Sequence, residues 1–258
     1  MPYADINGIR FNYSVSGKGD PVVLIAGFGS NIGFWRRATE ILSPEFSVIA
    51  VDNRGIGLTE YGGPFTMDDM GDDVVALLGH LGHKSAHILG WSMGSHVAQN
   101  IAIRHPDAVR TLTLVSSYLT RPARTAYMFH SAMDAVDNGM SSEYLGHLMN
   151  GLGYSESFFR NRENMNKPPR AATFDGMTGL RDQFRAIDGH DTTDTAHLIK
   201  APTLLVHGTD DIMVRHQETD ALCRLIAGSK CIKLKGVGHL VPSDDYIPQV
   251  AQFIRDYA

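Results

Sequence analysis

Cysteine is scarce in this chain of 258 residues, which contains only Cys223 and Cys231. Two cysteines cannot form a disulfide framework, and no Cys-x-x-Cys pair suggests a zinc or redox site. Basic residues are also few, because 23 Lys and Arg stand against 28 Asp and Glu, which gives a net charge of -5. Proteins that bind the phosphates of nucleic acids normally show a basic excess or stripe, so nucleic acid is excluded as an expected partner.

Long apolar segments are missing as well. No window approaches 18 uninterrupted apolar residues, so the sequence predicts no transmembrane helix and no membrane partner. Residues 1–8 lack the basic and then apolar run of a signal peptide. A cytoplasmic location is therefore expected, while the oligomeric state is left open.

Short apolar runs alternate with helical patterns along most of the chain. Asn7-Gly8, between two β-patterned segments, predicts a hairpin. Continuous apolar runs, typical of strands buried on both faces, occupy residues 22–26, 47–51, 86–89, 112–115 and 203–206, and an alternating run at 230–234 predicts an edge strand. Helical patterns occupy residues 66–81, 94–105 and 244–257, and Thr66 with Asp69 forms a variant capping box. This alternation predicts an α/β fold with a mostly parallel central sheet and helices on both faces.

The segment 118–199 interrupts the alternation. It is rich in methionine and aromatic residues, contains no strand-like run, and is too long for a loop. The length of the whole chain, about 1.7 average domains, fits one large domain with an insertion. We therefore predict a core made of residues 1–117 and 200–258, with residues 118–199 inserted as a helical cap over an apolar pocket.

A candidate nucleophile lies in Gly90-Trp91-Ser92-Met93-Gly94, which fits the pattern G-x-S-x-G. The match alone is weak, but it directly follows a predicted strand and directly precedes a predicted helix. That context is what a nucleophile elbow requires, because the serine must lie on a sharp strand-to-helix turn. The alternative is a plain glycine-rich turn without chemistry.

A serine hydroxyl needs a base, and the base needs a carboxylate to orient it. His239 follows the last predicted strand in Gly236-Val237-Gly238-His239, and Asp211 follows the strand before it in Gly208-Thr209-Asp210-Asp211. The spacing from Gly208 favours Asp211, with Asp210 as the alternative. The chain order Ser92, Asp211, His239 is that of α/β-hydrolases and differs from two serine-protease orders.

Acyl transfer also needs donors directed at the developing oxyanion. The backbone N–H groups of Met93, after the serine, and Phe28, in the loop after the first central strand, are predicted to supply them. Trp91 and Leu240 are predicted to line the substrate pocket beside Phe28 and Met93, because their neighbours in sequence carry the chemistry. Neither a metal ion nor a cofactor is implied, since His80, His83 and His87 lack the H-E-x-x-H pattern. His96 is expected to be packed or adjacent to the pocket.

Five motifs together resemble the α/β-hydrolase superfamily: Gly27-Phe28-Gly29, Asp52-Asn53-Arg54-Gly55-Ile56-Gly57, and the three that carry Ser92, Asp211 and His239. The resemblance covers nearly the whole chain outside the cap and is nearest to small capped enol-lactonase and methylesterase-type enzymes. It implies a serine hydrolase that cleaves an ester, lactone or thioester of an apolar acyl group, with water as co-substrate, through an acyl-enzyme.

Two departures from the family pattern bear on the activity. Ala26 stands where many members have histidine, so the support of the oxyanion loop is expected to differ. Asp52 and Arg54 are expected to brace the loop below the site rather than to perform chemistry. Relatives that hydrolyse C–C bonds usually have Asp-x-Pro-Gly in the second loop and tryptophan after the histidine. Here these positions read Asp-Asn-Arg-Gly and Leu240, which counts against that activity. C–C cleavage, perhydrolysis and a ligand-receptor role on the same fold remain alternatives.

Overall fold

The computed structural model describes residues 2–166 and 177–257. It begins with the predicted hairpin, in which β1 (Tyr3–Ile6) pairs antiparallel with β2 (Ile9–Ser16). The turn residues Asn7 and Gly8 have φ angles of 49° and 79°. Both positive angles are those of a two-residue turn whose twist matches the flanking strands, which is why Asn-Gly serves here.

The hairpin leads into one eight-stranded sheet of order β1-β2-β4-β3-β5-β6-β7-β8. The later strands are β3 (Pro21–Ile25), β4 (Ser47–Val51), β5 (Ala86–Trp91), β6 (Val109–Val115), β7 (Thr203–Gly208) and β8 (Lys230–Leu234). All six pair in parallel with their neighbours among themselves, whereas β2 pairs antiparallel with β4. The predicted α/β fold with a mostly parallel sheet is confirmed, and β8 is an edge strand.

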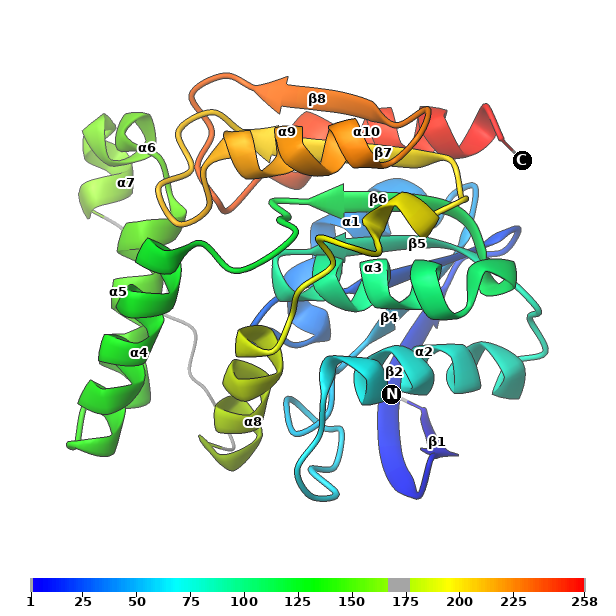
Figure 1. The fold of residues 1–258 in the computed structure, drawn as a ribbon, viewed down its shortest axis with the longest axis horizontal. Helices are drawn as coiled ribbons and strands as arrows, with labels where there is room; N and C mark the ends of the chain where they lie inside the picture. Colours follow the sequence, from blue (N-terminus) through cyan, green and yellow to red (C-terminus); the bar gives the residue numbers. More distant parts are fainter. Residues whose placement is uncertain (1, 167–176, 258) are drawn as a thin grey trace.

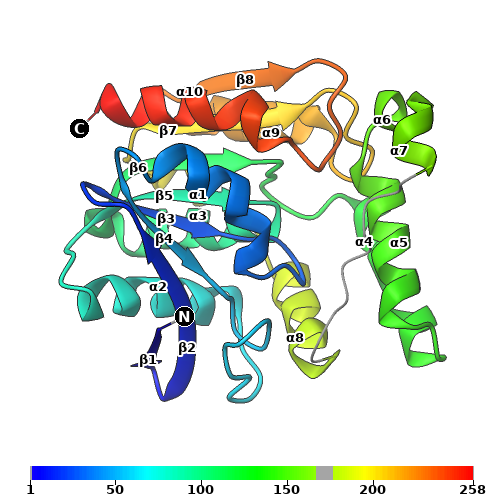
Figure 2. The same cartoon turned by 180° about the vertical axis from the view of Figure 1, so that it is seen from behind.

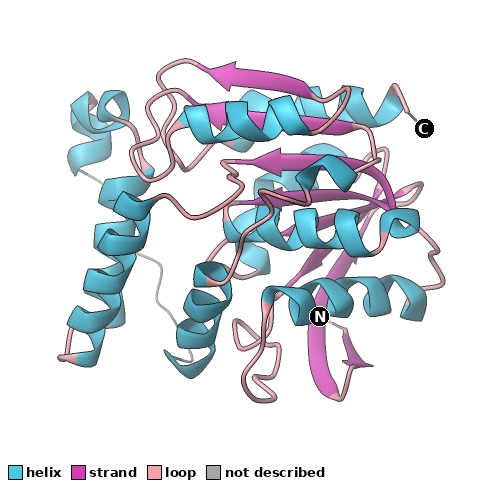
Figure 3. Cartoon of the chain, in the orientation of Figure 1, coloured by secondary structure: helices cyan, strands magenta, loops and turns pink. Residues whose placement is uncertain are grey.

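Helices cover both faces of this sheet (Figures 1, 2 and 3). On one face lie α2 (Met67–His80), α3 (Met93–Arg104) and α9 (His216–Leu225), and on the other α1 (Arg36–Leu42) and α10 (Ser243–Arg255). Alternate residues of β3 divide between them, because Val23 and Ile25 belong to the core beneath α2 and α3, and Leu24 to the core beneath α1 and α10. Burial on both faces explains the unbroken apolar runs.

Between β6 and β7 the described part of the chain forms the helices α4 (Ala123–Asp137), α5 (Ser142–Gly153), α6 (Glu156–Arg160), α7 (Arg162–Asn166) and α8 (Met177–Asp188). They lie beyond the carboxyl ends of the parallel strands, away from the C-terminus of the chain (Figure 1). Residues 167–176 of the predicted cap lie outside the described residues, and the boundaries 118–199 stay a prediction. None of the described helices combines the length and apolar composition that a membrane span requires.

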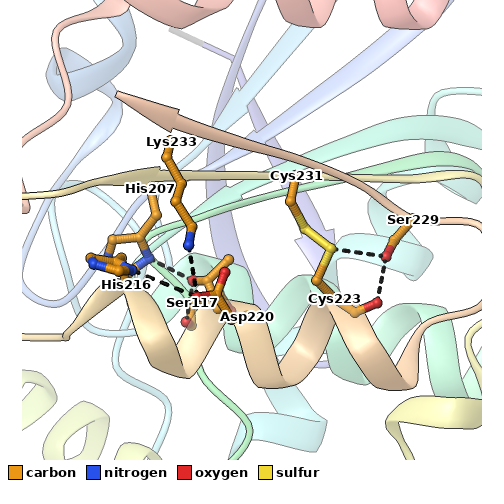
Figure 4. Close-up of a disulfide and its surroundings, with 9 residues drawn as sticks. Ser117, His207, His216, Asp220, Cys223, Ser229, Cys231 and Lys233 are labelled. Carbon is orange, nitrogen blue, oxygen red and sulfur yellow. Dashed lines mark hydrogen bonds and ion pairs between the residues drawn. A yellow bond between two sulfur atoms is a disulfide. The ribbon is translucent and has the colours of Figure 1, made fainter. Parts of the chain in front are cut away.

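A disulfide joins Cys223, near the end of α9, to Cys231 on β8 (Figure 4). No motif in the sequence predicted a role for these two cysteines. Their positions explain the bond, because the chain turns back after α9 and runs directly into the neighbouring edge strand, so that residues only 8 apart meet. A single bond that closes so short a loop is consistent with the expectation that two cysteines form no disulfide framework. It attaches α9 to the edge strand of the sheet.

Candidate active site

Ser92 lies on a sharp turn between β5, which ends at Trp91, and α3, which begins at Met93. Its backbone angles, φ 53° and ψ -122°, fall in a region that residues with a side chain rarely occupy. Such strain costs on the order of 1–3 kcal/mol and is kept where the surrounding structure enforces it. The conformation raises the serine side chain above the carboxyl end of the sheet.

The glycines of the motif allow backbone segments to approach closely at this turn. A Cβ atom on Gly94 would lie 2.0 Å from the carbonyl oxygen of Ile25, and one on Gly90 would lie 2.2 Å from the carbonyl oxygen of Gly94. The first contact is with the neighbouring strand β3, so α3 can start this near the sheet only without a side chain there. The motif is thus required sterically as well as chemically.

We expect Gly94→Ala to destabilise the protein by at least about 2 kcal/mol, because overpacking against fixed backbone has no inexpensive relaxation. Gly79→Ala is the matched control: Gly79 is helical, and a Cβ atom added there would meet nothing within 4 Å. Alanine should stabilise that position by about 0.5–1 kcal/mol. Urea unfolding of both variants measures the difference, and equal midpoints would contradict the steric account.

Ser92, His239 and Asp211 are brought together from three different strand ends. His239 Nε2 lies 2.8 Å from Ser92 Oγ, and His239 Nδ1 lies 2.7 Å from Asp211 Oδ2. Asp211 and His239 are buried, whereas Ser92 is half-buried. The alternative acid, Asp210, is exposed, and its carboxylate accepts a hydrogen bond from the neighbouring Thr209. Geometry therefore selects Asp211 over Asp210 as the partner of the histidine.

The carboxylate of Asp211 is held at both oxygens. Its Oδ1 accepts hydrogen bonds from the backbone N–H groups of Met213 and Val214, each at 2.9 Å. Burial by itself would raise the pKa of Asp211, but the charge of His239 and hydrogen bonds from His207 and His239 outweigh burial and hold it well below the usual range. The acid is therefore ionised at neutral pH and available to orient the imidazole.

A second histidine, His207 at the end of β7, lies against the same carboxylate. His207 Nε2 is 3.0 Å from Asp211 Oδ2 and 2.8 Å from the carbonyl oxygen of Val214, and Nδ1 contacts Thr219 Oγ1 on α9. Because Nε2 faces two acceptors, it carries a proton and donates. Thr219 in turn hydrogen-bonds the carbonyl of Ser117, so α9 is tied to the site as well as to β8 (Figure 4).

The loop after β3 approaches the nucleophile closely, since a Cβ atom on Gly27 would lie 3.1 Å from that of Ser92. Two amide side chains support it: Asn53 Nδ2 donates to the carbonyl of Ala26 at 3.0 Å, and Gln183 Oε1, from α8, accepts from the N–H of Gly29 at 2.9 Å. These contacts provide the support that differs from the histidine of many relatives. No local pattern could have pointed to Gln183, which is more than 150 positions away.

The loop after β4, which contains Asp52 and Arg54, is itself held by these two charged side chains. Asp52 Oδ1 accepts from the N–H of Ile32 at 2.7 Å, and its Oδ2 accepts from that of Leu58 at 2.9 Å. Arg54 forms an ion pair with Asp73 of α2, at 2.5 Å. Both side chains thus hold backbone or a neighbouring helix and make contacts of a structural kind.

The residues predicted to supply the oxyanion donors, Met93 and Phe28, line a small recess that Ser92 also lines. Met93 is the first residue of α3, where a backbone N–H has no intrahelical partner. Phe28 lies in the loop that approaches Ser92, and its side chain packs edge-on against Phe129 of α4, with ring centroids 5.6 Å apart. Their role as donors stays a prediction.

A cavity of about 260 Å³ opens beside Ser92 and His239. Trp91, Leu240 and Phe28 line this cavity, whereas Met93 lines the smaller recess that also contacts Ser92 and His239. The lining residues from the inserted helices, which include Phe129, Met149 and Tyr154, were not predicted from the sequence. Phe34, Tyr154 and Leu240 are shared with an outer cleft of about 570 Å³, so the cavity continues toward the surface.

His96, four positions after the nucleophile, is buried in the same recess, where it stacks on His190 and packs at a tilt against Tyr118. Its ring centroid lies 4.1 Å from that of Tyr118 and 4.3 Å from that of His190. It is therefore both packed and adjacent to the pocket. Across the described residues, no three or more His, Cys, Asp or Glu side chains are grouped as a metal ion would need.

A serine on a strained strand-to-helix turn, followed in chain order by an acid and a histidine at later strand ends, defines the class of α/β-hydrolases. A family model described as alpha/beta hydrolase fold matches residues 20–246, and the chain belongs to this family.

The identity to individual relatives is below 30% in the examples that follow. The chain is similar to a pimeloyl-[acyl-carrier protein] methyl ester esterase of Neisseria meningitidis, at 28% identity over 92% of each chain. It is also similar to a protein of Yersinia enterocolitica provisionally named carbamate hydrolase RutD, at 26% identity over 88% of this chain and 84% of the other. Among solved structures, the enol-lactonase of Burkholderia xenovorans has a TM-score of 0.86 at 24% identity over 99% of each chain, which shows a shared fold.

Proposed function

We propose that the protein is a serine hydrolase that cleaves a carboxylic ester, lactone or thioester through an acyl-enzyme on Ser92. The observation that carries the proposal is the continuous pair of hydrogen bonds from Ser92 Oγ through His239 to Asp211. A neutral imidazole so placed can take the serine proton, and the buried carboxylate stabilises the imidazolium that forms. Two similar proteins are named as a methyl ester esterase and an enol-lactonase, and these names support hydrolysis of an ester or lactone bond.

The reaction then follows from the positions of the groups. Ser92 Oγ attacks the carbonyl carbon as its proton passes to His239 Nε2, and the N–H groups of Met93 and Phe28 stabilise the oxyanion. Each such donor is worth about 2.7–4 kcal/mol. His239 returns the proton to the leaving alcohol, thiol or ring oxygen, and then activates a water molecule that releases the acid and restores the serine.

The cavity indicates an apolar substrate. Its lining consists of aromatic, methionine, leucine, glycine and small polar residues beside Ser92 and His239, with no Asp, Glu, Lys or Arg among the described lining residues. A volume of about 260 Å³ is near the lower end for small-molecule sites. We propose that it receives the apolar chain of the substrate, with the remainder extending into the outer cleft.

The test combines covalent labelling with a substrate panel. A fluorophosphonate should add one equivalent of label to Ser92, identified by peptide mass spectrometry, and should block turnover of short-chain esters, lactones and thioesters. Dienoic acids with a cleavable C–C bond, and peroxide with a carboxylic acid, are included in the panel. If Ser92 is labelled but only the dienoic acids or the peroxide mixture are turned over, the triad catalyses C–C cleavage or perhydrolysis and not ester hydrolysis. Labelling without multiple turnover, together with large stabilisation by ligand, would indicate a receptor.

A further inference from the structure

A small recess adjoins Ser92 and is distinct from the apolar cavity. Its volume is about 20 Å³, and its lining includes Ser92, Met93, His96, Tyr118 and Arg121. Phe28, Phe129 and Met213 line both the recess and the larger cavity, as do Ser92 and His239, so the two spaces adjoin at the nucleophile. One molecule bound at the nucleophile can therefore place one group in the recess and another in the cavity.

Arg121 is the unusual member of this lining, because a guanidinium is seldom so well buried. Its side chain is 5% exposed, with Nη1 paired to the carboxylate of Asp188. Its Cζ atom lies 4.9 Å from the ring centroid of Phe129 and 4.8 Å from that of Phe184. These contacts fix the plane of the guanidinium between two aromatic rings and leave it little freedom.

Two nitrogens of Arg121, Nε and Nη2, are buried and have no hydrogen-bond partner among the residues that the structure describes. Buried donors without partners are costly, so such atoms call for an explanation. Nε–H and one Nη2–H point the same way from the guanidinium plane and form the edge that a carboxylate accepts in two parallel hydrogen bonds. The Nε–H and Nη2–H groups of Arg121 can thus together bind one carboxylate.

The rest of the recess favours an anion. No Asp or Glu is among its described lining residues. Burial, followed by the nearby charges of His190, Arg121 and His239, lowers the pKa of His96 well below its usual value, so His96 is neutral at neutral pH. Its ring nitrogens also lack partners among the described residues and can supply a further donor. The fixed positive charge of the recess is that of Arg121, and its partner Asp188 is not part of the described lining.

We infer that the substrate carries a carboxylate, and that Arg121 binds it in the recess while the scissile carbonyl lies at Ser92. The inference rests on the proposed function and narrows its substrate class to esters, thioesters or lactones with a free acid group. A recess of about 20 Å³ holds one or two water-sized groups, which suits a carboxylate and not a longer chain. Because Ser92 lines the same recess, only a short spacer separates the acid from the scissile carbonyl.

The experiment compares matched substrates in matched variants. The substrates are methyl esters of succinic, glutaric and adipic acids, each with the second carboxyl free or converted to its neutral primary amide; acetate esters of short hydroxy acids and of their amides place the charge on the leaving group. The variants are Arg121→Gln, Arg121→Lys and the control Arg181→Gln, which removes a more exposed guanidinium paired with Asp137. Thermal unfolding verifies that each variant is folded.

We expect the parent to prefer an acid over its amide in kcat/KM at one chain length, by about 100-fold, the worth of a charge-assisted hydrogen bond. Arg121→Gln should abolish that preference while turnover of the amides stays. Arg121→Lys should keep part of it, and Arg181→Gln all of it. Equal preference in the parent and Arg121→Gln, or none in the parent, would overturn the inference while leaving the hydrolase intact.

Failure of the proposed function has a different signature. In that case neither acids nor amides are hydrolysed by any variant, and Ser92 is not labelled by a fluorophosphonate. The recess is then tested by binding alone, with succinate, glutarate and adipate titrated calorimetrically into the parent and Arg121→Gln. Binding at one chain length that is lost in Arg121→Gln supports the carboxylate site, and equal or absent binding overturns it. If Arg121→Gln does not fold, the parent's acid-to-amide ratio and Arg121→Lys decide.

Discussion

Ser92→Ala should lower kcat for any ester or lactone substrate by about 10⁵–10⁶-fold, the largest effect expected of a single substitution in this chain. The hydroxyl is the atom that would attack the carbonyl, and His239 Nε2, 2.8 Å away, then has no proton to remove. What remains is binding and polarisation of the carbonyl, which accounts for residual rates above those in water. Steady-state kinetics with the best substrate of the panel measures the loss.

The fold should survive this change, because the variant removes one half-buried hydroxyl and keeps the backbone of the turn. Thermal unfolding within a few degrees of the parent is expected. Ser131→Ala, on the exposed side of α4, is the matched control and should leave kcat unchanged. Near-parental turnover in Ser92→Ala would remove Ser92 from the reaction and with it the proposed acyl-enzyme.

The strands of the central sheet could be predicted because burial on both faces leaves one signal in a sequence, a short unbroken apolar run. Residues 22–26 and 203–206 were found in this way, and the structure places β3 and β7 there. The positions of Ser92 and Asp211 followed from such runs, and that of His239 from the alternating run at 230–234, because the carboxyl ends of parallel strands share an edge. Topology thus brings together residues that lie up to 147 positions apart.

Other parts of the site depend on pairings that leave no local signal. His207 directly follows the apolar run at 203–206, and nothing in the sequence indicates that it contacts Thr219 on α9 and Asp211. Gln183 and Arg121 belong to the inserted segment, where helical periodicity predicts burial but not which loop or ring a side chain meets. The bond between Cys223 and Cys231 likewise depends on how α9 returns to the edge strand.

Asp211→Asn should lower kcat by about 10⁴-fold, a large loss but a smaller one than that of the nucleophile. The amide has two orientations. With its NH₂ group at the Oδ1 position, it would face the N–H donors of Met213 and Val214, which cannot change their polarity. With NH₂ at the Oδ2 position it faces His239 Nδ1, which can move its proton to Nε2, and His207 Nε2, which keeps its proton for the carbonyl of Val214 and loses one of its two acceptors. The second orientation is the less costly one, so His239 Nδ1 becomes an acceptor and its proton lies on Nε2.

An Nε2–H directed at Ser92 cannot accept the serine proton, so the loss appears in kcat rather than in KM. Asp210→Asn is the matched control: its carboxylate is exposed, one position away, and hydrogen-bonds Thr209 Oγ1 at 3.0 Å. Kinetics of the two variants at one pH separates the roles, with near-parental rates expected for Asp210→Asn. The reverse ranking would move the acid to Asp210, and equal small effects would mean that His239 acts without a carboxylate partner. The two substitutions remove the same charge at adjacent positions. A loss of kcat in Asp211→Asn alone therefore depends on the contact with the imidazole and not on the charge.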